Sequence, residues 1–366
     1  MKTLLLAIAL SAALPSLAAP AAWMTSFSGR TQAAGLVVVD GSPVVAYTST
    51  PCVAPSEKDD PHFRNRMAIT RFDATGKQLY DVEIPRPKEV VARLRGPSYG
   101  VIDGIAALPD GDLMVVAEFI EGFPWLLRVD SKTGGVRFSK AIGDPQGLTV
   151  IAAVAPVGDD VVIVGGVGAK IYFARYSANG EKRWEQSVNA GDSGSAHSVA
   201  ALGDGSIVVA ATSERQIILL HLDASGQTLG QRRFEGTSPQ LATTRDTIGV
   251  AYDVLNTAQS LRFKALDASL AELAEVPFDA AASAQFLAAQ NGSFRLFTGE
   301  PEKIRMTSFS ARGKREEQSD VADVKFAVQI FDAGDYLAFV DPFFHDNGTL
   351  CGKARVARIS LSKGIQ

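Results

Sequence analysis

The sequence lacks any hydrophobic run long enough to cross a membrane, and it lacks an excess of positive charge. Asp, Gly or Lys interrupts every apolar stretch before it reaches the roughly 20 residues of a transmembrane helix. Lys and Arg together number 36 against 40 Asp and Glu, and the two signs are interspersed. The electrostatic footprint of a nucleic-acid-binding protein is therefore missing. We expect neither a membrane span nor a nucleic acid partner.

Helical periodicity is scarce as well. Few segments place apolar residues at helical spacing over three turns, which argues against a helical fold. The chain has 33 glycines, and its apolar residues are rich in Val, Ile, Ala and Leu. This composition predicts an all-β protein.

The N-terminus has the pattern of a signal peptide. Lys2 precedes an apolar run from Leu4 to Leu14, and small residues around Ala18 follow. We expect cleavage after Ala18 and export to the periplasm or the exterior of a bacterial cell. The mature chain, residues 19–366, has no cysteine near its start that would carry a lipid, so we expect it to be soluble.

A four-stranded unit recurs along the mature chain. In the clearest copy, residues 105–108, 113–117, 125–130 and 134–139 read as strands, and a second copy begins at residue 198. Asp-Gly pairs join the first two strands, because they supply the positive φ of a two-residue hairpin. First turns are predicted at Asp40-Gly41, Asp110-Gly111, Gly158-Asp159, Asp204-Gly205, Asp246-Thr247, Asn291-Gly292 and Ala333-Gly334. The sequence therefore contains seven units.

Units of this kind are expected to stack around an axis. A single meander buries neither of its two apolar faces, whereas radial stacking buries both between neighbours. A β-solenoid has shorter repeats, and a β-sandwich does not require a regular four-strand period. We therefore predict one all-β domain, a seven-bladed β-propeller of four-stranded antiparallel blades, with six or eight blades as alternatives.

The two chain ends are predicted to close this ring. The last unit stops near residue 360 without a fourth strand, and residues 23–28 remain unused before the first unit. An N-terminal strand in the last blade would remove an unpaired edge. Cys52 and Cys351 each follow the second strand of their unit, so closure would bring them to one face of adjacent blades. In an exported protein they predict one disulfide, with two unrelated thiols as the alternative.

The outer part of the repeat, at residues 130–138 and 177–184, resembles two related families. These are the tryptophan-docking repeat of pyrroloquinoline-quinone-type propellers and the delta-type repeat of secreted bacterial propellers. Trp184 occupies the position of the docking tryptophan, Phe138 occupies it in another copy, and elsewhere the position is expected to be non-aromatic. Because of that departure the resemblance implies no quinone, and no cofactor is predicted.

Three local motifs suggest chemistry but lack the context that the chemistry needs. The segment Gly191-Asp192-Ser193-Gly194 resembles a protease nucleophile segment without its histidine base. The glycine-rich segment 161–170 leads into a strand, whereas a phosphate loop leads into a helix. Residues 177–184 resemble a sialidase Asp-box with Asn179 in the acidic position. We interpret all three as an inter-blade loop or turns, and we predict no catalytic residue.

The remaining candidate is a metal or ligand site at the ring seam. Two long loops of the first and last units carry the possible ligands, which are Asp59, Asp60 and His62, and His345 and Asp346. Carboxylate and imidazole suit a metal ion, and scaffolds present binding residues on loops. A solvated loop pair that only carries the disulfide is the alternative. The two other histidines, His197 and His221, lie in strands and are interpreted as packed or surface residues.

Two functions remain open from the sequence. One is an exported, monomeric, non-enzymatic binding or scaffold protein that uses a loop face for a protein or glycan partner. The other is a glycan hydrolase or lyase whose carboxylates are dispersed over the blades. Paired carboxylates in a deep axial pocket would favour the enzyme, since the fold alone favours neither.

Overall fold

The computed structural model describes residues 23–26, 30–50, 66–88, 100–119, 123–143, 149–191, 193–255, 257, 260–278, 283–300, 303–321, 329–340, 344–346, 349–351 and 354–358. All 30 regular elements within these ranges are β-strands. No helix in this part of the chain is long and apolar enough to span a membrane.

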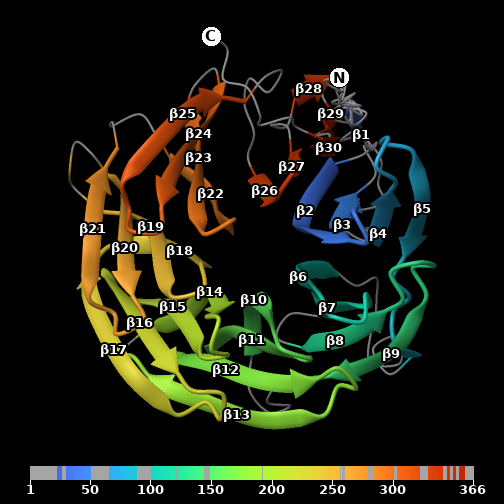
Figure 1. Cartoon of the computed structure of the whole chain (residues 1–366). Coiled ribbons are helices and arrows are strands. Elements are labelled where there is room, and N and C mark those ends of the chain that lie inside the picture. Colours follow the sequence, from blue (N-terminus) through green and yellow to red (C-terminus); the bar gives the residue numbers. More distant parts are fainter. Residues whose placement is uncertain are drawn as a thin grey trace, which may run out of the picture.

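Seven four-stranded antiparallel sheets surround a central axis as the blades of a propeller (Figure 1). The predicted fold class and the count of seven blades are therefore confirmed. Blade 1 consists of β2 (Arg30–Val39), β3 (Ser42–Thr50), β4 (Arg66–Phe72) and β5 (Gln78–Glu83). Blade 2 consists of β6 (Val101–Ala107), β7 (Leu113–Glu118), β8 (Pro124–Val129) and β9 (Val136–Ala141). Blade 3 consists of β10 (Thr149–Val157), β11 (Asp160–Val167), β12 (Lys170–Ser177) and β13 (Lys182–Asn189).

The remaining four blades follow in chain order. Blade 4 consists of β14 (Gly194–Ala201), β15 (Ile207–Ser213), β16 (Gln216–Leu222) and β17 (Thr228–Glu235). Blade 5 consists of β18 (Thr237–Thr243), β19 (Thr247–Asp253), β20 (Leu261–Asp267) and β21 (Glu272–Pro277). Blade 6 consists of β22 (Ser283–Gln290), β23 (Ser293–Glu300), β24 (Lys303–Ser310) and β25 (Arg315–Asp320). Blade 7 consists of β26 (Gln329–Ala333), β27 (Tyr336–Val340), β30 (Ala354–Arg358) and β1 (Trp23–Ser26).

The N-terminal strand closes the ring. β1 pairs antiparallel with β30 as the outer strand of blade 7, from Trp23 opposite Arg358 to Ser26 opposite Arg355. This pairing confirms the predicted closure and covers the edge that β30 would otherwise expose. Residues 27 and 28 of the predicted strand, and the expected signal peptide, lie outside the described ranges.

The predicted first turns join the inner strand of each blade to its second strand. Asp40 and Gly41 form the expected two-residue turn, with φ of 51° and 71°. Gly111 and Gly205 also have positive φ, 87° and 82°, but each ends a three-residue loop that is closed by a backbone hydrogen bond such as Leu108 N–H to the Asp112 carbonyl. In blade 5 the turn lies one residue earlier than expected, because Thr247 already begins β19.

The hydrophobic core is divided among the seven blade interfaces. Each of seven buried clusters combines side chains from two neighbouring blades, including one cluster between blades 7 and 1. Successive residues of a second strand alternate between the two sides. In β11, Val161 packs toward blade 2 and Val162 packs toward blade 4. The continuous apolar runs in the sequence therefore follow from sheets that are buried on both faces.

Aromatic rings on the outer strands of the first three blades dock on the following blade. Each ring covers the glycine of the neighbour's outer turn, where a Cβ atom would lie 2.8 Å from the ring of Phe138 and 3.0 Å from that of Trp184. The rings are Tyr80, Phe138 and Trp184, and the glycines beneath them are Gly134, Gly180 and Gly226. The expectation of a non-aromatic residue in other copies is thus wrong for blade 1, where Tyr80 docks.

Hydrogen bonds to the same outer turns reinforce this docking. The Trp184 Nε1 donates to the Ala224 carbonyl at 3.0 Å, and the Tyr80 hydroxyl donates to the Ser131 carbonyl at 2.8 Å. Arginines of the third strands donate to these turns as well, at distances of 2.8 Å for Arg71 and 2.9 Å for Arg175. Arg358 extends the pattern across the seam to the Ala74 carbonyl of blade 1 at 3.3 Å.

Removing the Trp184 indole tests the docking contact. We expect Trp184→Ala to lower the free energy of unfolding by about 2–3 kcal/mol, because a half-buried ring and its hydrogen bond are lost. Arg183→Ala is the control, since the neighbouring Arg183 side chain is 52% exposed, and its effect should stay within about 0.5 kcal/mol. Urea unfolding compares the two variants, and equal losses would contradict a docking role for Trp184.

A chain that begins at residue 30 lacks β1 and leaves β30 with an open edge. We expect its free energy of unfolding to fall by about 2–4 kcal/mol through the lost ladder hydrogen bonds. We also expect self-association through the exposed edge. A chain that begins at residue 23 is the matched control. Thermal unfolding and light scattering give the comparison, and identical behaviour of the two chains would show that β1 does not hold the ring closed.

Candidate functional site

Six successive inner strands carry a β-bulge at the same level of the ring. The ladder between each inner strand and its neighbour skips a residue at Ala33/Gly35, Ile102/Gly104, Ile151/Ala153, Ala196/Ser198, Thr237/Gln240 and Ala284/Phe286. A bulge leaves the extra residue unpaired and changes the direction of its side chain. Among the extra residues are Ala34, Asp103, Ala152 and His197.

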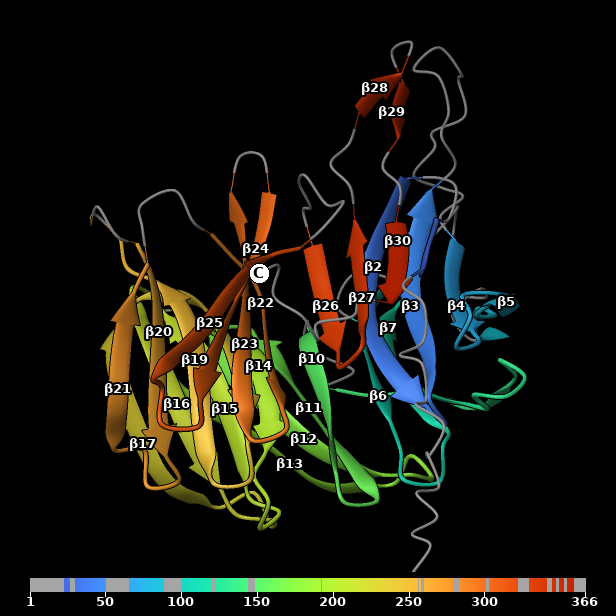
Figure 2. The same cartoon turned by 45° about the horizontal axis from the view of Figure 1, so that its top comes forward.

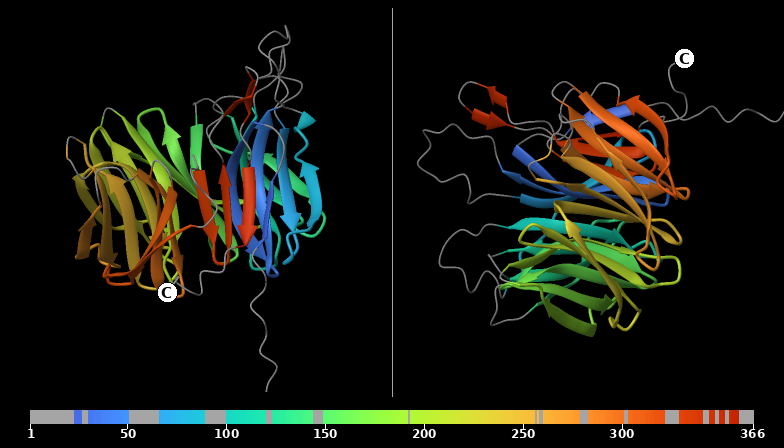
Figure 3. Two further views of the ribbon diagram at one scale, coloured as in Figure 1. Left: turned by 90° about the horizontal axis from the view of Figure 1, so that it is seen from above. Right: turned by 90° about the vertical axis from the view of Figure 1, so that its left-hand side faces the viewer.

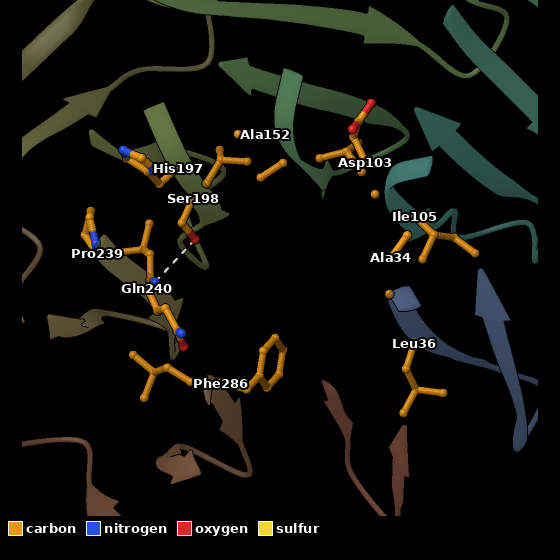
Figure 4. Close-up of a pocket in the computed structure, with 17 residues that line it drawn as sticks. Ala34, Leu36, Asp103, Ile105, Ala152, His197, Ser198, Pro239, Gln240 and Phe286 are labelled. Carbon is orange, nitrogen blue, oxygen red and sulfur yellow. Dashed lines mark hydrogen bonds between the residues drawn. The ribbon is translucent and has the colours of Figure 1, made fainter. Parts of the chain in front are cut away.

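The residues at and after these bulges surround an axial pocket of about 320 Å³ (Figure 4). The inner strands converge there, so small residues are needed where one strand faces the next. A Cβ on Gly35 would lie 2.6 Å from Ile105 Cγ2, and one on Gly104 would lie 2.8 Å from Val154 Cγ1. Blades 5 and 6 have larger residues at the corresponding position, Gln240 and Phe286.

An aliphatic ring forms one level of the wall, and few polar side chains accompany it. The aliphatic residues come one from each of six blades and are Leu36, Ile105, Val154, Val199, Leu241 and Leu287. The polar lining side chains are Asp103, His197, Ser198 and Gln240, and no Lys or Arg belongs to the described lining. The pocket is therefore mostly apolar, with acidic and neutral polar groups at fixed points.

Asp103, which lines the pocket, forms a carboxyl pair with Glu118 of the neighbouring strand in blade 2. Glu118 pairs with Val101, and Asp103 follows Val101 by two residues, so both carboxyl groups lie on one face of the sheet. Asp103 Oδ2 is buried and has no hydrogen-bond partner. Burial, and then the nearby charge of Glu118, raise the pKa of Asp103 to about 8. At neutral pH the pair therefore retains one proton.

Blade 4 uses the same position for a histidine. Thr212 pairs with Ser195, and His197 follows Ser195 by two residues, as Asp103 follows Val101 in blade 2. His197 Nε2 lies 2.6 Å from Thr212 Oγ1, and burial lowers the pKa of His197, so the ring is neutral at pH 7. Sequence reasoning placed His197 in a strand correctly but did not place it in a pocket.

Blades 4 and 5 are joined at the pocket wall. The Leu241 backbone N–H donates to Ser198 Oγ at 3.2 Å, as the dashed line in Figure 4 marks. Next to it, Gln240 Oε1 is buried and has no hydrogen-bond partner. The pocket thus contains two buried oxygen atoms without partners, one from blade 2 and one from blade 5.

The predicted seam residues lie away from this pocket or outside the described chain. Asp59, Asp60, His62 and Cys52 fall in a range that is not described. His345 and Asp346 belong to β28 (Phe344–Asp346), and Cys351 ends β29 (Thr349–Cys351), so part of the expected loop is a hairpin. β29 lies next to β2 of blade 1. The disulfide and the metal site both stay predictions.

The three motifs without chemical context have the structures that we expected. Gly191 and Ser193 lie between β13 and β14, whereas Asp192 of that motif lies outside the described residues. Gly168-Ala169 form the turn between β11 and β12. The Asp-box-like segment contains the turn between β12 and β13. His221 is 8% exposed and hydrogen-bonds to Ser206 Oγ at 2.8 Å, which confirms it as a packed residue.

Sequence reasoning missed the Asp103–Glu118 pair. The sequence pattern predicts a repeat that begins at Ile105, whereas the inner strand of blade 2 begins at Val101. An alignment of the blades from their first turns would have placed an aspartate where other copies have Ala34 and Ala152. A charged residue at a position that is Ala in blades 1 and 3 is the signal that was available.

Comparisons with known proteins show the fold and no more. The chain has no matching family model and no matching curated protein. Among solved structures it is similar to the Dos1 propeller, with a TM-score of 0.56, 10% identity, and coverage of 91% of this chain and 95% of that chain. Hydrazine synthase of Kuenenia stuttgartiensis has a TM-score of 0.58 at 13% identity and coverage of 84% and 92%. The propeller domain of the Pyrococcus furiosus trilobed protease has a TM-score of 0.53 at 11% identity and coverage of 89% and 92%.

The carboxyl pair makes stability depend on pH. Folding raises the pKa of Asp103 from its ordinary value of 3.8 to about 8, so between these values the folded protein holds more protons than the unfolded chain. Stability from this group therefore falls as pH rises across that window. We expect Asp103→Asn to be more stable than wild type by on the order of 2 kcal/mol at about pH 9, and nearly equal at about pH 4.

Urea unfolding of both proteins at the two pH values measures this difference. Asp110→Asn is the control, because Asp110 lies in an exposed turn of the same blade. A difference between Asp103→Asn and wild type that does not change with pH would mean that the carboxyl group is not held in its neutral form.

Proposed function

We propose that the protein is an exported, non-enzymatic binding or scaffold propeller that holds a protein partner on one loop face. The observation that carries the proposal is the β28–β29 hairpin. It is inserted between the second and third strands of blade 7 and projects beyond the ring (Figures 2 and 3). A rigid ring that presents a protruding element on one face is suited to holding a partner.

The hairpin has the properties of an incomplete sheet. Each of its strands has three residues, and among the described strands each pairs only with the other. A two-stranded hairpin is marginally stable in water by itself. Its open edges offer backbone hydrogen bonds to an extended segment of another protein, which would add a strand. This chemistry favours a protein partner over a glycan.

The carboxyl pair does not support the hydrolase alternative. Glycoside hydrolases hold two carboxyl groups on either side of the bond that they cleave. Of the two, only Asp103 belongs to the described lining of the axial pocket, so the pair does not place a carboxyl group on either side of a ligand there. The remaining titratable side chain of the described lining is His197.

Export is part of the proposal and rests on the signal-peptide pattern at residues 1–18. An oxidising compartment would allow Cys52 and Cys351 to pair. Because Cys351 ends β29 and β29 lies beside blade 1, that disulfide would fasten the base of the hairpin to the first blade.

Site-specific photo-crosslinking in the native cells tests the proposed face. A benzophenone amino acid at position 345, in β28, should crosslink to one discrete protein. The control places it at Leu229, which is 60% exposed on the outer strand of blade 4. The same products from both positions, or none from position 345, would refute a partner on the hairpin face. Release of sugars from an envelope glycan by the purified protein would instead favour the hydrolase.

A further inference from the structure

The axial pocket has the dimensions of a small-molecule site. Its volume of about 320 Å³ is at the lower end of the range for such sites, which are mostly apolar with a few fixed polar groups. A bulge in one blade would be a local irregularity, whereas six at the same level form a continuous wall. The pocket lies on the ring axis, whereas the β28–β29 hairpin projects beyond the ring, so a ligand here would be a function separate from the proposed one.

Hydrocarbon makes up most of this wall. Besides the aliphatic ring from six blades, Phe286 contributes an aromatic ring from blade 6. Ala34 and Ala152, the extra residues of two bulges, have short side chains that leave the centre of the ring open. Val150, two residues before Ala152 in β10, is 53% exposed, so apolar surface continues along that strand. A ligand that covers these side chains removes apolar surface from water, which favours binding.

The titratable side chains of the described lining are uncharged at neutral pH. The pKa of Asp103 is raised to about 8, which keeps this carboxyl group largely protonated. The pKa of His197 is lowered by burial, which keeps its ring neutral. No Lys or Arg belongs to the lining that the structure describes. A charged ligand would lose its hydration here and meet no opposite charge among these residues.

The bulge of blade 5 adds backbone strain at the pocket wall. Ser238 and Pro239 together stand opposite Tyr252, and Pro239 lines the pocket. Ser238 has a φ of 53°, a left-handed conformation that is costly for a residue other than glycine. Strain of this kind is found preferentially where a binding site is shaped.

Ser198 supplies a hydrogen-bond donor to the same wall. Its Oγ accepts from the Leu241 backbone N–H at 3.2 Å, and its own O–H has no acceptor among the residues that the structure describes. A hydroxyl group can donate and accept at the same time. Figure 4 shows Ser198 on the side of the cavity opposite Leu36 and Ile105. The complementary ligand therefore has an acceptor at one end and hydrocarbon at the other.

We propose that this pocket binds a neutral, mostly apolar small molecule with one hydrogen-bond acceptor, such as a ring system that carries a ketone. The ligand oxygen accepts from the Ser198 hydroxyl, and the hydrocarbon part contacts the aliphatic ring and Phe286.

Equilibrium dialysis of the full chain against three naphthalenes of the same shape tests the proposal. They are 2-acetonaphthone, which has a ketone, 2-isopropylnaphthalene, which has no acceptor, and 2-naphthoate, which is an anion. We expect saturable one-to-one binding of the two neutral compounds at neutral pH. The anion should bind at least about tenfold more weakly than the ketone, because it loses more hydration on entering the pocket.

Two variants locate the binding. Ala152→Phe fills the cavity from an exposed position of the wall and should weaken binding of the ketone at least about tenfold. Ala271→Phe is the matched control, since Ala271 is exposed beside the outer turn of blade 5, and it should leave binding unchanged. Ser198→Ala should weaken binding of the ketone about fivefold and leave that of 2-isopropylnaphthalene unchanged.

Three results would overturn the proposal. They are the absence of saturable ketone binding to the wild type, equal binding of ketone and anion, and undiminished binding by a folded Ala152→Phe variant. A Ser198→Ala variant that binds both neutral compounds as the wild type does would contradict the hydrogen bond. The comparison of the three compounds uses the wild type alone, so it remains decisive even when a variant does not fold. None of these results depends on the hairpin crosslinks.

Discussion

The structure depends on one constraint, which is that each blade is apolar on both faces. In β15, Val208 and Ala210 pack toward blade 5, whereas Val209 and Ala211 pack toward blade 3. A sheet of this kind is stable only between two neighbours, so the stack has to close on itself. The interface between blades 7 and 1 completes the series, and the pairing of β1 with β30 holds it together.

Closure also explains why the pocket has its particular lining. Radial packing brings the inner strands close together, so Gly35 and Gly104 stand where a side chain would collide with the next blade. The bulges leave Asp103 and His197 unpaired in their ladders, and both residues line the pocket.

The aromatic residues that dock one blade on the next show how far such a role can be recognised from the amino-acid sequence alone. Trp184 was recognised from its place after the outer turn of its own unit. Tyr80 holds the same position but became recognisable only through its contact with Gly134 of the next blade. Asp103 was missed for a related reason. A β-bulge interrupts the alternation of side chains between the two faces of a sheet, and this alternation is what identifies a strand in a sequence. The pattern therefore predicts an inner strand of blade 2 that begins after Asp103.

The amino-acid sequence by itself determined the strands, the turns, the seven units and the use of the N-terminus to complete the last blade. These features depend on contacts between residues near one another in the chain, such as Asp40 and Gly41, or on a count of units. Only the tertiary structure decided which side chains face the axis and that Asp103 stays protonated at neutral pH. Those properties arise where inner strands from six blades converge. Residues as distant in the chain as Leu36 and Leu287 line the same pocket there.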